Sequence, residues 1–327
     1  MSVKVAVVGL GIGKVHLEHY SEIKGVEIVG GVDINPDVRK SVEKDYGIKC
    51  YNSSEELLRN VIPDGVSICT PPDTHLYLTK ICAEKGVHIL CEKPMAPSIK
   101  DCEKMIEICK KNKVILLIGF KKRFAPAYRF LKEKFEKEFG VPKSAVVKFG
   151  LGRVGNGWFW DEKSGGGPVI ENAVHMVDLM HFFFGDVESV YGVGGNLFMH
   201  QYAPQVDTAL FVMRFKNGGV ASIGSGYLSE WGFAKEEVMI STEKVVCEVK
   251  GPFDSPKYLE YIKRESPSSI HKKTFPDADG FKDEIKHFVD CIKRKQIPAV
   301  DSEAGLYALK VCLAIKKSVR SGKVVYL

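Results

Sequence analysis

A glycine-rich turn between two apolar segments most constrains what this chain can fold into. Residues 3–8 have the length and composition of a buried strand, and they lead into Gly9-Leu10-Gly11-Ile12-Gly13. A helix is expected from this turn to about residue 24, and a second strand over residues 26–32 ends at Asp33. Strand, glycine turn, helix and strand in this order are typical of a dinucleotide-binding βαβ unit.

The residues of the turn have separate tasks in such a unit. Gly9 permits the tight turn, and Gly11 lets the backbone approach a pyrophosphate, which the N–H groups at the start of the helix can bind. Ile12 and Gly13 complete the predicted cofactor-binding turn. The strict glycine pattern requires glycine at position 14, but Lys14 stands there and Gly13 comes one residue early.

The acidic residue after the second strand bears on the choice of cofactor. Asp33 can accept hydrogen bonds from both ribose hydroxyls of an adenosine, and it is followed by Ile34, a further candidate cofactor contact. A carboxylate repels the 2′-phosphate of NADP, so NAD is favoured and NADP is the less favoured alternative. Arg39 and Lys40 are close enough in sequence to reach such a phosphate.

Strands and helices continue to alternate up to residue 119, which predicts a doubly wound parallel sheet of about six strands in a dinucleotide-binding domain over residues 1–121. Ligands bind beyond the carboxyl ends of the strands of such a sheet. Two of these ends carry polar candidates, Thr70 with Pro71, and Glu92 with Lys93. His75 lies early in the next helix, where it either packs locally or contacts the same cofactor.

After residue 121 the regular alternation of strands and helices ends. Residues 122–327 are predicted to form a second domain of the α+β class with a large mixed or antiparallel sheet. The C-terminal helices of this part could pack back on the first domain. The expected elements are strands near 143–149, 187–197, 206–216, 219–228, 236–241 and 244–249, helices over 169–184, 281–295 and 302–321, and a polar loop over 251–279.

Ionisable residues share one face of the predicted helix over 169–184. Glu171, His175 and Asp178 are spaced i, i+4 and i+7, in a helix that is otherwise apolar. An imidazole there suits proton transfer near neutral pH, although a buried structural histidine has the same sequence pattern. Just before this helix, Trp160 belongs to an aromatic cluster that either packs internally or covers a substrate.

Composition narrows the partners and the compartment. The net charge of +6 is spread over 47 basic and 41 acidic residues, which is typical of solvated faces and predicts no nucleic-acid partner. The nine cysteines include no Cys-x-x-Cys pair, which indicates reduced thiols in a cytoplasmic protein and predicts neither disulfides nor a metal site. No apolar run is long enough to cross a bilayer, so no membrane association is expected.

From end to end the chain resembles the Gfo/Idh/MocA oxidoreductases, the relatives of glucose–fructose oxidoreductase and inositol dehydrogenase. The matching motifs are the glycine turn, Thr70-Pro71, Glu92-Lys93-Pro94, Arg123-Phe124, Gly165-Gly166-Gly167 with His175 and Asp178, and Phe288-Val289-Asp290. This resemblance implies catalytic roles for Lys93, His175 and the acid four residues before the histidine, here Glu171 where Asp is usual. It also suggests a cis Lys93–Pro94 peptide bond and a homo-oligomer, either a dimer or a tetramer. By the same resemblance, residues 122–327 are the substrate-binding and oligomerisation domain.

Two departures fall near the expected pocket: Ala173 stands where glycine is usual and Lys121 where asparagine is common. Together with Arg123 and Trp160, the residues Glu171 and His175 form the predicted substrate-binding set. The resulting hypothesis is an NAD(P)-dependent dehydrogenase that acts on a CH–OH group of a sugar, cyclitol or sugar nucleotide. Two alternatives stay open: a non-catalytic NAD-sensing regulator, and a glycosidase that uses NAD transiently.

Overall fold

The computed structural model describes residues 2–327, which form two compact units. Of the described residues, the first unit contains 2–121 and 281–306, and the second contains 122–280 and 307–327. Each unit therefore takes in one stretch of the C-terminal region. No helix within residues 2–327 has both the length and the apolar character needed to span a membrane.

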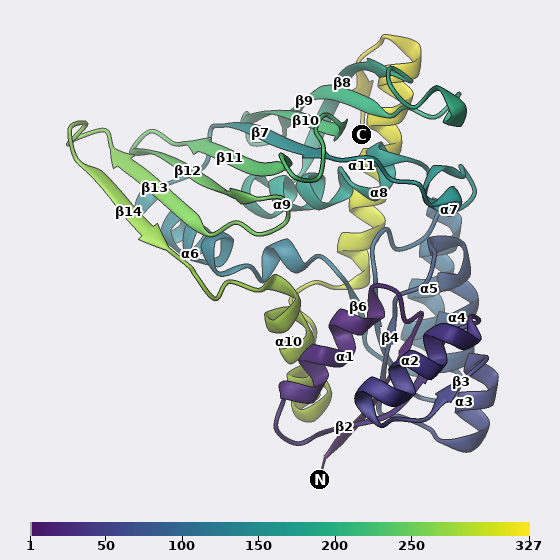
Figure 1. Cartoon of the computed structure of the whole chain (residues 1–327). Helices are drawn as coiled ribbons and strands as arrows, with labels where there is room; N and C mark the ends of the chain where they lie inside the picture. The colour runs from purple at the N-terminus through teal and green to yellow at the C-terminus, as the bar shows by residue number, and fades with distance from the viewer. Residues whose placement is uncertain (1) are drawn as a thin grey trace. The chain divides into compact units, whose positions relative to one another are not determined.

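A six-stranded parallel sheet forms the centre of the first unit (Figure 1). Its strands follow the order β3-β2-β1-β4-β5-β6, which is the predicted doubly wound arrangement, with the order reversing between β1 and β4. The strands are β1 (Val3–Val8), β2 (Val26–Val32), β3 (Cys50–Tyr51), β4 (Gly65–Ile68), β5 (His88–Cys91) and β6 (Leu116–Ile118).

Helices of the first unit begin where short polar side chains can cap them. Asn35, Ser53 and Ser98 each accept a hydrogen bond from a backbone N–H of the first turn that follows. The helices are α1 (Gly13–Glu22), α2 (Pro36–Tyr46), α3 (Ser54–Asn60), η1 (Pro72–Thr74), α4 (His75–Ala83), α5 (Ile99–Asn112) and α10 (Gly280–Arg294). Phe288 and Val289 of α10 lie in the same buried cluster as Val5 and Leu17, so this C-terminal helix completes the core of the first unit.

The second unit is built on a nine-stranded sheet with the order β14-β13-β12-β11-β7-β10-β9-β8-β15. The β7 and β10 strands pair in parallel and the other neighbours pair antiparallel, so the sheet is mixed, as predicted. The strands are β7 (Ser144–Leu151), β8 (Val187–Gly195), β9 (Thr208–Phe215), β10 (Val220–Tyr227), β11 (Lys235–Ser241), β12 (Val245–Pro252), β13 (Tyr258–Lys263), β14 (Ile270–Thr274) and β15 (Val325–Tyr326).

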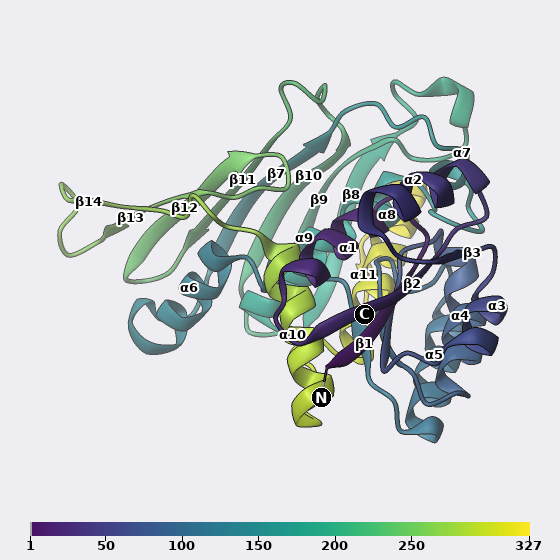
Figure 2. The ribbon, with the colours of Figure 1, turned by 60° about the horizontal axis from the view of Figure 1, so that its bottom comes forward.

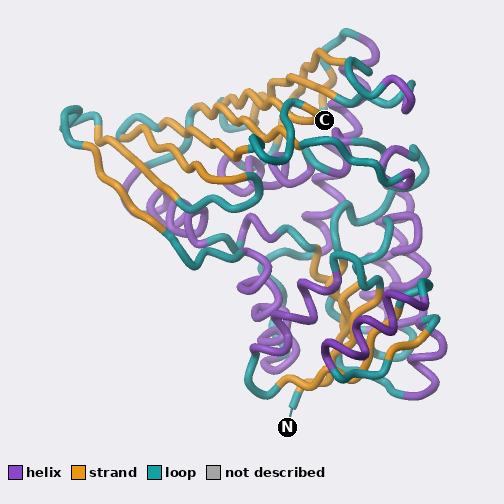
Figure 3. The backbone as a smooth tube through the Cα atoms, in the orientation of Figure 1, coloured by secondary structure: helices purple, strands orange, loops and turns teal. Residues whose placement is uncertain are grey.

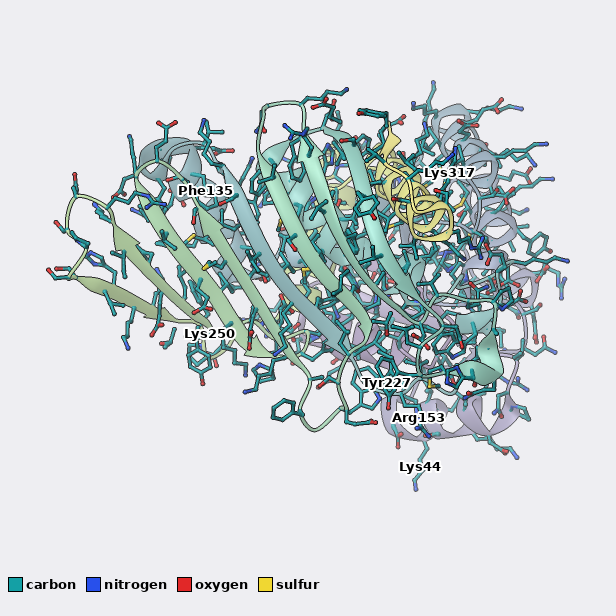
Figure 4. All side chains as sticks on the ribbon, turned by 90° about the horizontal axis from the view of Figure 1, so that it is seen from above. Lys44, Phe135, Arg153, Tyr227, Lys250 and Lys317 are labelled. Atoms are coloured by element: carbon teal, nitrogen blue, oxygen red, sulfur yellow. The ribbon has the colours of Figure 1, made fainter. Side chains whose placement is uncertain are left out.

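Helices of the second unit gather on one face of this sheet, where α6 and α9 lie under the strands in both ribbon views (Figures 1 and 2). The opposite face is seen without a covering helix among the described residues (Figures 3 and 4). The helices are η2 (Lys121–Arg123, which begins at the last residue of the first unit), α6 (Pro126–Lys134), η3 (Phe135–Phe139), α7 (Gly157–Trp160), α8 (Pro168–Glu171), α9 (Val174–Phe184), η4 (His200–Tyr202) and α11 (Ser302–Ser321).

Two predictions for the second unit are wrong, those of a loop over 251–279 and of one continuous helix over 169–184. The segment 251–279 contains the β13–β14 hairpin. A short strand at residues 325–326, which was not predicted, pairs with β8.

The helix over 169–184 is interrupted between α8 and α9. The N–H groups of Asn172 and Ala173 both bond the carbonyl of Pro168, so the backbone widens by one residue there. The Asn172 amide also bonds Phe149 O and Ser225 Oγ, which anchors this turn to the sheet.

Candidate active site

The glycine turn after β1 has the geometry that dinucleotide binding requires. Gly9 has a φ of +86°, and a Cβ at this position would lie 2.7 Å from Cys69 O. A Cβ on Gly11 would meet nothing within 4 Å, so the backbone there faces open space. A Cβ on Gly13 would lie 2.7 Å from the Val7 side chain. Gly13 therefore provides the close helix–strand packing for which the strict pattern uses position 14.

Asp33 lies at the end of β2, directly beside this turn. Its Oδ2 accepts a hydrogen bond from Leu10 N at 2.8 Å, and its Oδ1 accepts one from Asn35 N at 2.8 Å. Arg39 donates to the backbone carbonyls of Asp33 and Ile34 at 2.7 and 3.1 Å. The carboxylate is thus fixed at the rim of the glycine turn, and the Ile34 side chain beside it is 90% exposed.

The loop after β4 lies against the same turn, since a Cβ on Gly9 would be 2.8 Å from Thr70 Cγ2. Thr70 Oγ1 and Thr74 Oγ1 are 2.6 Å apart, and Thr74 also donates to Pro71 O. His75 is fully buried behind this loop, with Nε2 2.8 Å from Thr70 O. Burial lowers the pKa of His75, so the neutral ring donates to Thr70 and supports the loop from inside.

Beyond β5, the segment Glu92–Pro94 enters a loop with a cis Lys93–Pro94 peptide bond, as predicted. The Glu92 side chain is nearly buried and its Oε2 accepts a hydrogen bond from Lys93 N at 3.2 Å. Its Oε1 lies 3.1 Å from Nε2 of His16, a histidine of α1. The sequence alone does not single out His16, because only the fold brings it to the end of β5.

In the second unit, a glycine loop leads into the two helices that carry Glu171 and His175. Gly166 and Gly167 have φ values of +71° and +81°, which L side chains rarely adopt, and Pro168 then starts α8. Glu171 is the last residue of α8, and His175 is the second residue of α9. His175 is 5% exposed, and its ring lies edge-on to Phe149 of β7 at 6.4 Å.

Asp178 differs from the other two members of the predicted stripe because it is committed to an ion pair. Arg123 makes two hydrogen bonds to its carboxylate, at 2.8 and 2.7 Å, and Asp178 is fully buried. Burial nevertheless raises the pKa of Asp178 to about 6, although Arg123 acts in the opposite direction. Two N–H groups of the Arg123 guanidinium are used in this ion pair. The predicted contact of Arg123 with substrate stays a prediction.

Trp160 lies inside a small aromatic cluster and is 4% exposed. Its ring stacks on Tyr202 at 4.5 Å with an angle of 4° between the planes, and its indole N–H donates to Val154 O at 2.9 Å. These contacts are those of a packing residue, one of the two alternatives that the sequence left open. The neighbouring Trp158 is 37% exposed.

The first unit fits NAD on the evidence of its own residues. A dinucleotide needs three features that are present here: the open backbone at Gly11, free N–H groups at the start of a helix, and the fixed carboxylate of Asp33. The helix is α1, and no side chain among residues 2–327 caps its start. The residues that would hold the dinucleotide lie together at the carboxyl ends of β1, β2, β4 and β5. They are Gly9, Gly11, Ile12, Gly13, Asp33, Ile34, Thr70, Pro71, Glu92 and Lys93, with His75 behind them.

This fold and these residues define an oxidoreductase of the dinucleotide-binding class with a second α/β domain. Residues 3–120 match an oxidoreductase family with an NAD-binding Rossmann fold, and residues 132–327 match the C-terminal alpha/beta domain of the same family. The chain belongs to the Gfo/Idh/MocA oxidoreductase family, which confirms the resemblance, and its cofactor is NAD.

Several relatives match this chain over nearly their full length. The chain is 28% identical to a myo-inositol 2-dehydrogenase of Thermotoga maritima, over 99% of this chain and 98% of that protein. It is also 28% identical to a scyllo-inositol 2-dehydrogenase (NAD⁺) of Bacillus subtilis, over 99% and 96%. The WlbA dehydrogenase of Bordetella pertussis, solved with NADH and UDP-GlcNAcA, has the same fold, with a TM-score of 0.84, 24% identity and coverage of 100% and 99%.

The predicted site residues thus form two groups. The cofactor set and Lys93 belong to the first unit, whereas Arg123, Trp160, Glu171 and His175 belong to the second. Within each unit the structure brings the predicted residues to the ends of neighbouring elements. The meeting of Lys93 with His175 over one substrate stays a prediction.

Proposed function

We propose that this chain oxidises a secondary alcohol of a polyhydroxylated substrate. The substrate class is a sugar, a cyclitol or a sugar nucleotide. The observation that carries this proposal is the full-length match to inositol dehydrogenases together with the retention of Lys93, His175 and an acid at position 171. The same groups serve the reverse reaction, the reduction of a ketone.

The residue types supply what the reaction requires. Oxidation of an alcohol removes a hydride from carbon and a proton from oxygen, and NAD accepts the hydride when it is bound. His175 takes the proton from the hydroxyl, since an imidazole is an effective base near neutral pH. The Lys93 ammonium donates a hydrogen bond to the same oxygen and stabilises the negative charge that develops there. Glu171 orients His175 and balances its positive charge.

NAD is preferred over NADP because of charge at the end of β2. The fixed Asp33 carboxylate would repel a 2′-phosphate and accept hydrogen bonds from ribose hydroxyls. Arg39, the cation that could have offset this repulsion, already donates to two backbone carbonyls. The chemistry of this position therefore favours the cofactor with the free 2′-hydroxyl.

The active form is a homo-oligomer in which two copies pair through the uncovered face of the nine-stranded sheet. Support comes from a row of paired residues across that face. Tyr191, Val212, Val146 and Met239 on β8, β9, β7 and β11 are apolar, and Ser222 on β10 lies between Val212 and Val146. Each of the four apolar side chains is more than one-third exposed. An exposed patch that is mostly apolar is typical of an interface.

A reducing compartment, the cytoplasm, suits the cysteines. All nine are free thiols, eight of them buried. Buried thiols in apolar surroundings need no oxidising environment to be stable.

The proposed reaction is tested with a panel of inositols, sugars and sugar nucleotides, followed by nicotinamide absorbance with NAD and NADP separately. Lys93→Met and His175→Ala should each lower kcat by about 10² or more, the scale of losing a proton-transfer group or an oxyanion donor. Glu171→Gln should be milder. His181→Ala is the matched control, because His181 of α9 stacks on Tyr307 and pairs with Asp186.

Three outcomes separate the alternatives. Substrate-dependent net reduction of NAD supports the dehydrogenase. Cleavage of a glycoside without net reduction, by protein that retains bound cofactor, supports the glycosidase. NAD binding without turnover of any polyol supports the regulator and contradicts the proposed function.

A further inference from the structure

A chain of buried polar groups lies behind Lys93 in the first unit. Tyr20 OH is 2.8 Å from Ser67 Oγ, and Ser67 Oγ is 3.1 Å from Nδ1 of His16. Nε2 of His16 lies 3.1 Å from Oε1 of Glu92, whose Oε2 accepts the N–H of Lys93 at 3.2 Å. Tyr20, Ser67 and His16 are fully buried, so water does not compete for these hydrogen bonds.

In each arrangement of protons that satisfies this chain, Nε2 of His16 donates to Glu92. Lys93 N–H can only donate to Glu92, and an ionised Glu92 can only accept, so Nε2 of His16 carries a hydrogen. A neutral ring accepts the Ser67 hydroxyl hydrogen at Nδ1, whereas a protonated ring donates there and Ser67 then donates to Tyr20. The hydrogen bond from His16 to Glu92 is therefore present in both charge states of the ring.

The surroundings of Glu92 favour its charged form. Burial acts against the carboxylate, but the hydrogen bond and charge of His16, with the charges of Lys93 and Lys121, outweigh it and lower the pKa of Glu92. The other titratable groups that act on or feel Glu92 are Cys69, Cys91 and His75. Neither a thiol nor the neutral ring of His75 offers a positive charge that could replace His16.

Packing holds His16 and Lys121 in place from the side of α10. Phe281 lies edge-on to the His16 ring at 5.7 Å, and the ammonium of Lys121 lies 3.6 Å from the centre of the same Phe281 ring. Gly119 leaves room on the opposite side, since a Cβ there would come within 3.3 Å of the Glu92 side chain. Glu92 is therefore confined by contacts from α1, from Gly119 directly after β6, and from its own loop.

We propose that His16 is a positioning residue for the reaction, which holds the Glu92 carboxylate in place so that Glu92 in turn fixes Lys93 at the end of β5. This inference rests on the proposed function, in which Lys93 contacts the reacting oxygen. His16 itself touches neither substrate nor the reacting atoms. A histidine that only fills space in the core would affect stability and nothing else.

The test compares His16→Leu, His16→Gln and Glu92→Gln with the matched control His19→Leu. His19 lies in the same helix, is nearly buried, and pairs with Glu22 instead of Glu92. In His16→Leu, burial of Glu92 is no longer opposed by its main partner. The acid limb of kcat/KM with saturating NAD, to which Glu92 contributes an ionisation beside that of His175, should therefore move up by one pH unit or more. His16→Gln retains an N–H donor and should restore most of that shift. His19→Leu should leave the profile unchanged.

Two further results decide the mechanism. If His16 acts through Glu92, the double variant His16→Leu/Glu92→Gln should lose no more than threefold beyond Glu92→Gln alone, because the two act as a unit. A multiplicative loss overturns the proposal. So does a His16→Leu variant that melts earlier but retains the acid limb of the wild type.

A substrate-free readout separates failure of this inference from failure of the proposed function. A ¹³C NMR titration of the Glu92 side chain in NAD-loaded protein, assigned with Glu92→Gln, should show protonation at higher pH in His16→Leu than in the wild type. An unchanged titration overturns the role of His16 whether or not a polyol is turned over. A shifted titration in protein that turns over no polyol supports the coupling and contradicts only the proposed reaction.

Discussion

The Arg123–Asp178 pair sets two physical effects against each other at a single residue. The two short hydrogen bonds from the guanidinium favour the Asp178 carboxylate, whereas burial favours its neutral form. Burial prevails because Asp178 is completely enclosed, while the Arg123 side chain is 13% exposed and retains some contact with water. The pKa of Asp178 therefore lies at about 6, above the 3.8 of an ordinary Asp.

This shift makes stability depend on pH. A carboxyl with a higher pKa in the folded state stabilises the fold below its unfolded pKa, and this contribution is lost as the pH rises through the folded pKa. Wild-type stability from this group should therefore fall between about pH 4 and 6. In Arg123→Met the positive charge that favours the Asp178 carboxylate is removed, so the pKa of Asp178 should rise further. The free energy of unfolding should then continue to fall above pH 6, by up to about 1.4 kcal/mol per pH unit.

Urea unfolding of wild type and Arg123→Met at pH 5, 6, 7 and 8 measures this dependence. The double variant Arg123→Met/Asp178→Asn is the control, because it lacks the titrating group and should show no additional slope above pH 6. If Arg123→Met loses the same free energy at pH 5 as at pH 8, Asp178 does not titrate as we expect.

Asp33 is the single residue that we expect to determine the preference for NAD over NADP. Asp33→Ser should weaken NAD binding by about tenfold, the usual effect of losing hydrogen bonds to a charged acceptor, and should narrow the advantage over NADP because the repulsion is removed. Fluorescence titration with both cofactors measures this change. Asp37→Ser serves as the control, since Asp37 is exposed on α2. A wild type that binds NADP more tightly than NAD would contradict the assigned role of Asp33.

At the scale of elements, α11 secures the glycine loop that precedes Glu171 and His175. Lys316 of α11 is nearly buried, and its ammonium donates to Glu162, Gln205 and the carbonyl of Gly166 at 2.7, 2.9 and 3.0 Å. Burial lowers the pKa of Lys316, while Glu162 favours its charge. One side chain thus ties the loop of α8 to a helix near the C-terminal end of the chain.

Lys316→Met should therefore disturb both stability and catalysis. Three acceptors would lose their donor, and the two buried ones, Gln205 Oε1 and Gly166 O, would each cost roughly 1–3 kcal/mol. We expect a loss of about 2–4 kcal/mol in the free energy of unfolding and a severalfold lower kcat in the protein that stays folded, because the loop also positions Glu171. Lys317→Met is the matched control, as Lys317 is the next residue and is exposed (Figure 4). Equal effects of the two substitutions would exclude a role for the Lys316 contacts.

The same scale shows what local sequence could predict. The apolar runs of β1, β4 and β5 are buried on both faces, so their composition identified them. The β13–β14 hairpin could not be recognised, because all five residues of β14 are exposed and its pattern is that of a polar loop. The turn at Asn172–Ala173 depends on side-chain bonds to β7 and β10, which are distant in sequence. His16 was missed for the same reason, since Ser67 and Glu92 reach it only through the fold.

For the whole molecule, the uncovered face of the nine-stranded sheet divides into an apolar and a charged part. The mostly apolar row crosses β8 to β11, and Val193, Leu210 and Val220 extend it along the strands. Towards the β14 edge the same rows carry charges instead, where Lys250 pairs with Glu248 and Glu260 (Figure 4). A partner would bury the apolar part, while the charged part can stay in water.

Val212→Lys tests whether a second copy covers this face. Val212 lies within the mostly apolar row and is 48% exposed, so the substitution should change the free energy of unfolding of a single copy by less than about 0.5 kcal/mol. In a pair of copies it would place a charge in each facing apolar surface, which costs several kcal/mol without a partner charge. Sedimentation velocity at micromolar concentration should therefore show an oligomer for the wild type and monomers for Val212→Lys. Ile297→Lys, at an 86% exposed position outside the sheet, should sediment like the wild type. An oligomer that survives Val212→Lys would assign the interface to another surface, and a monomeric wild type would refute the homo-oligomer itself.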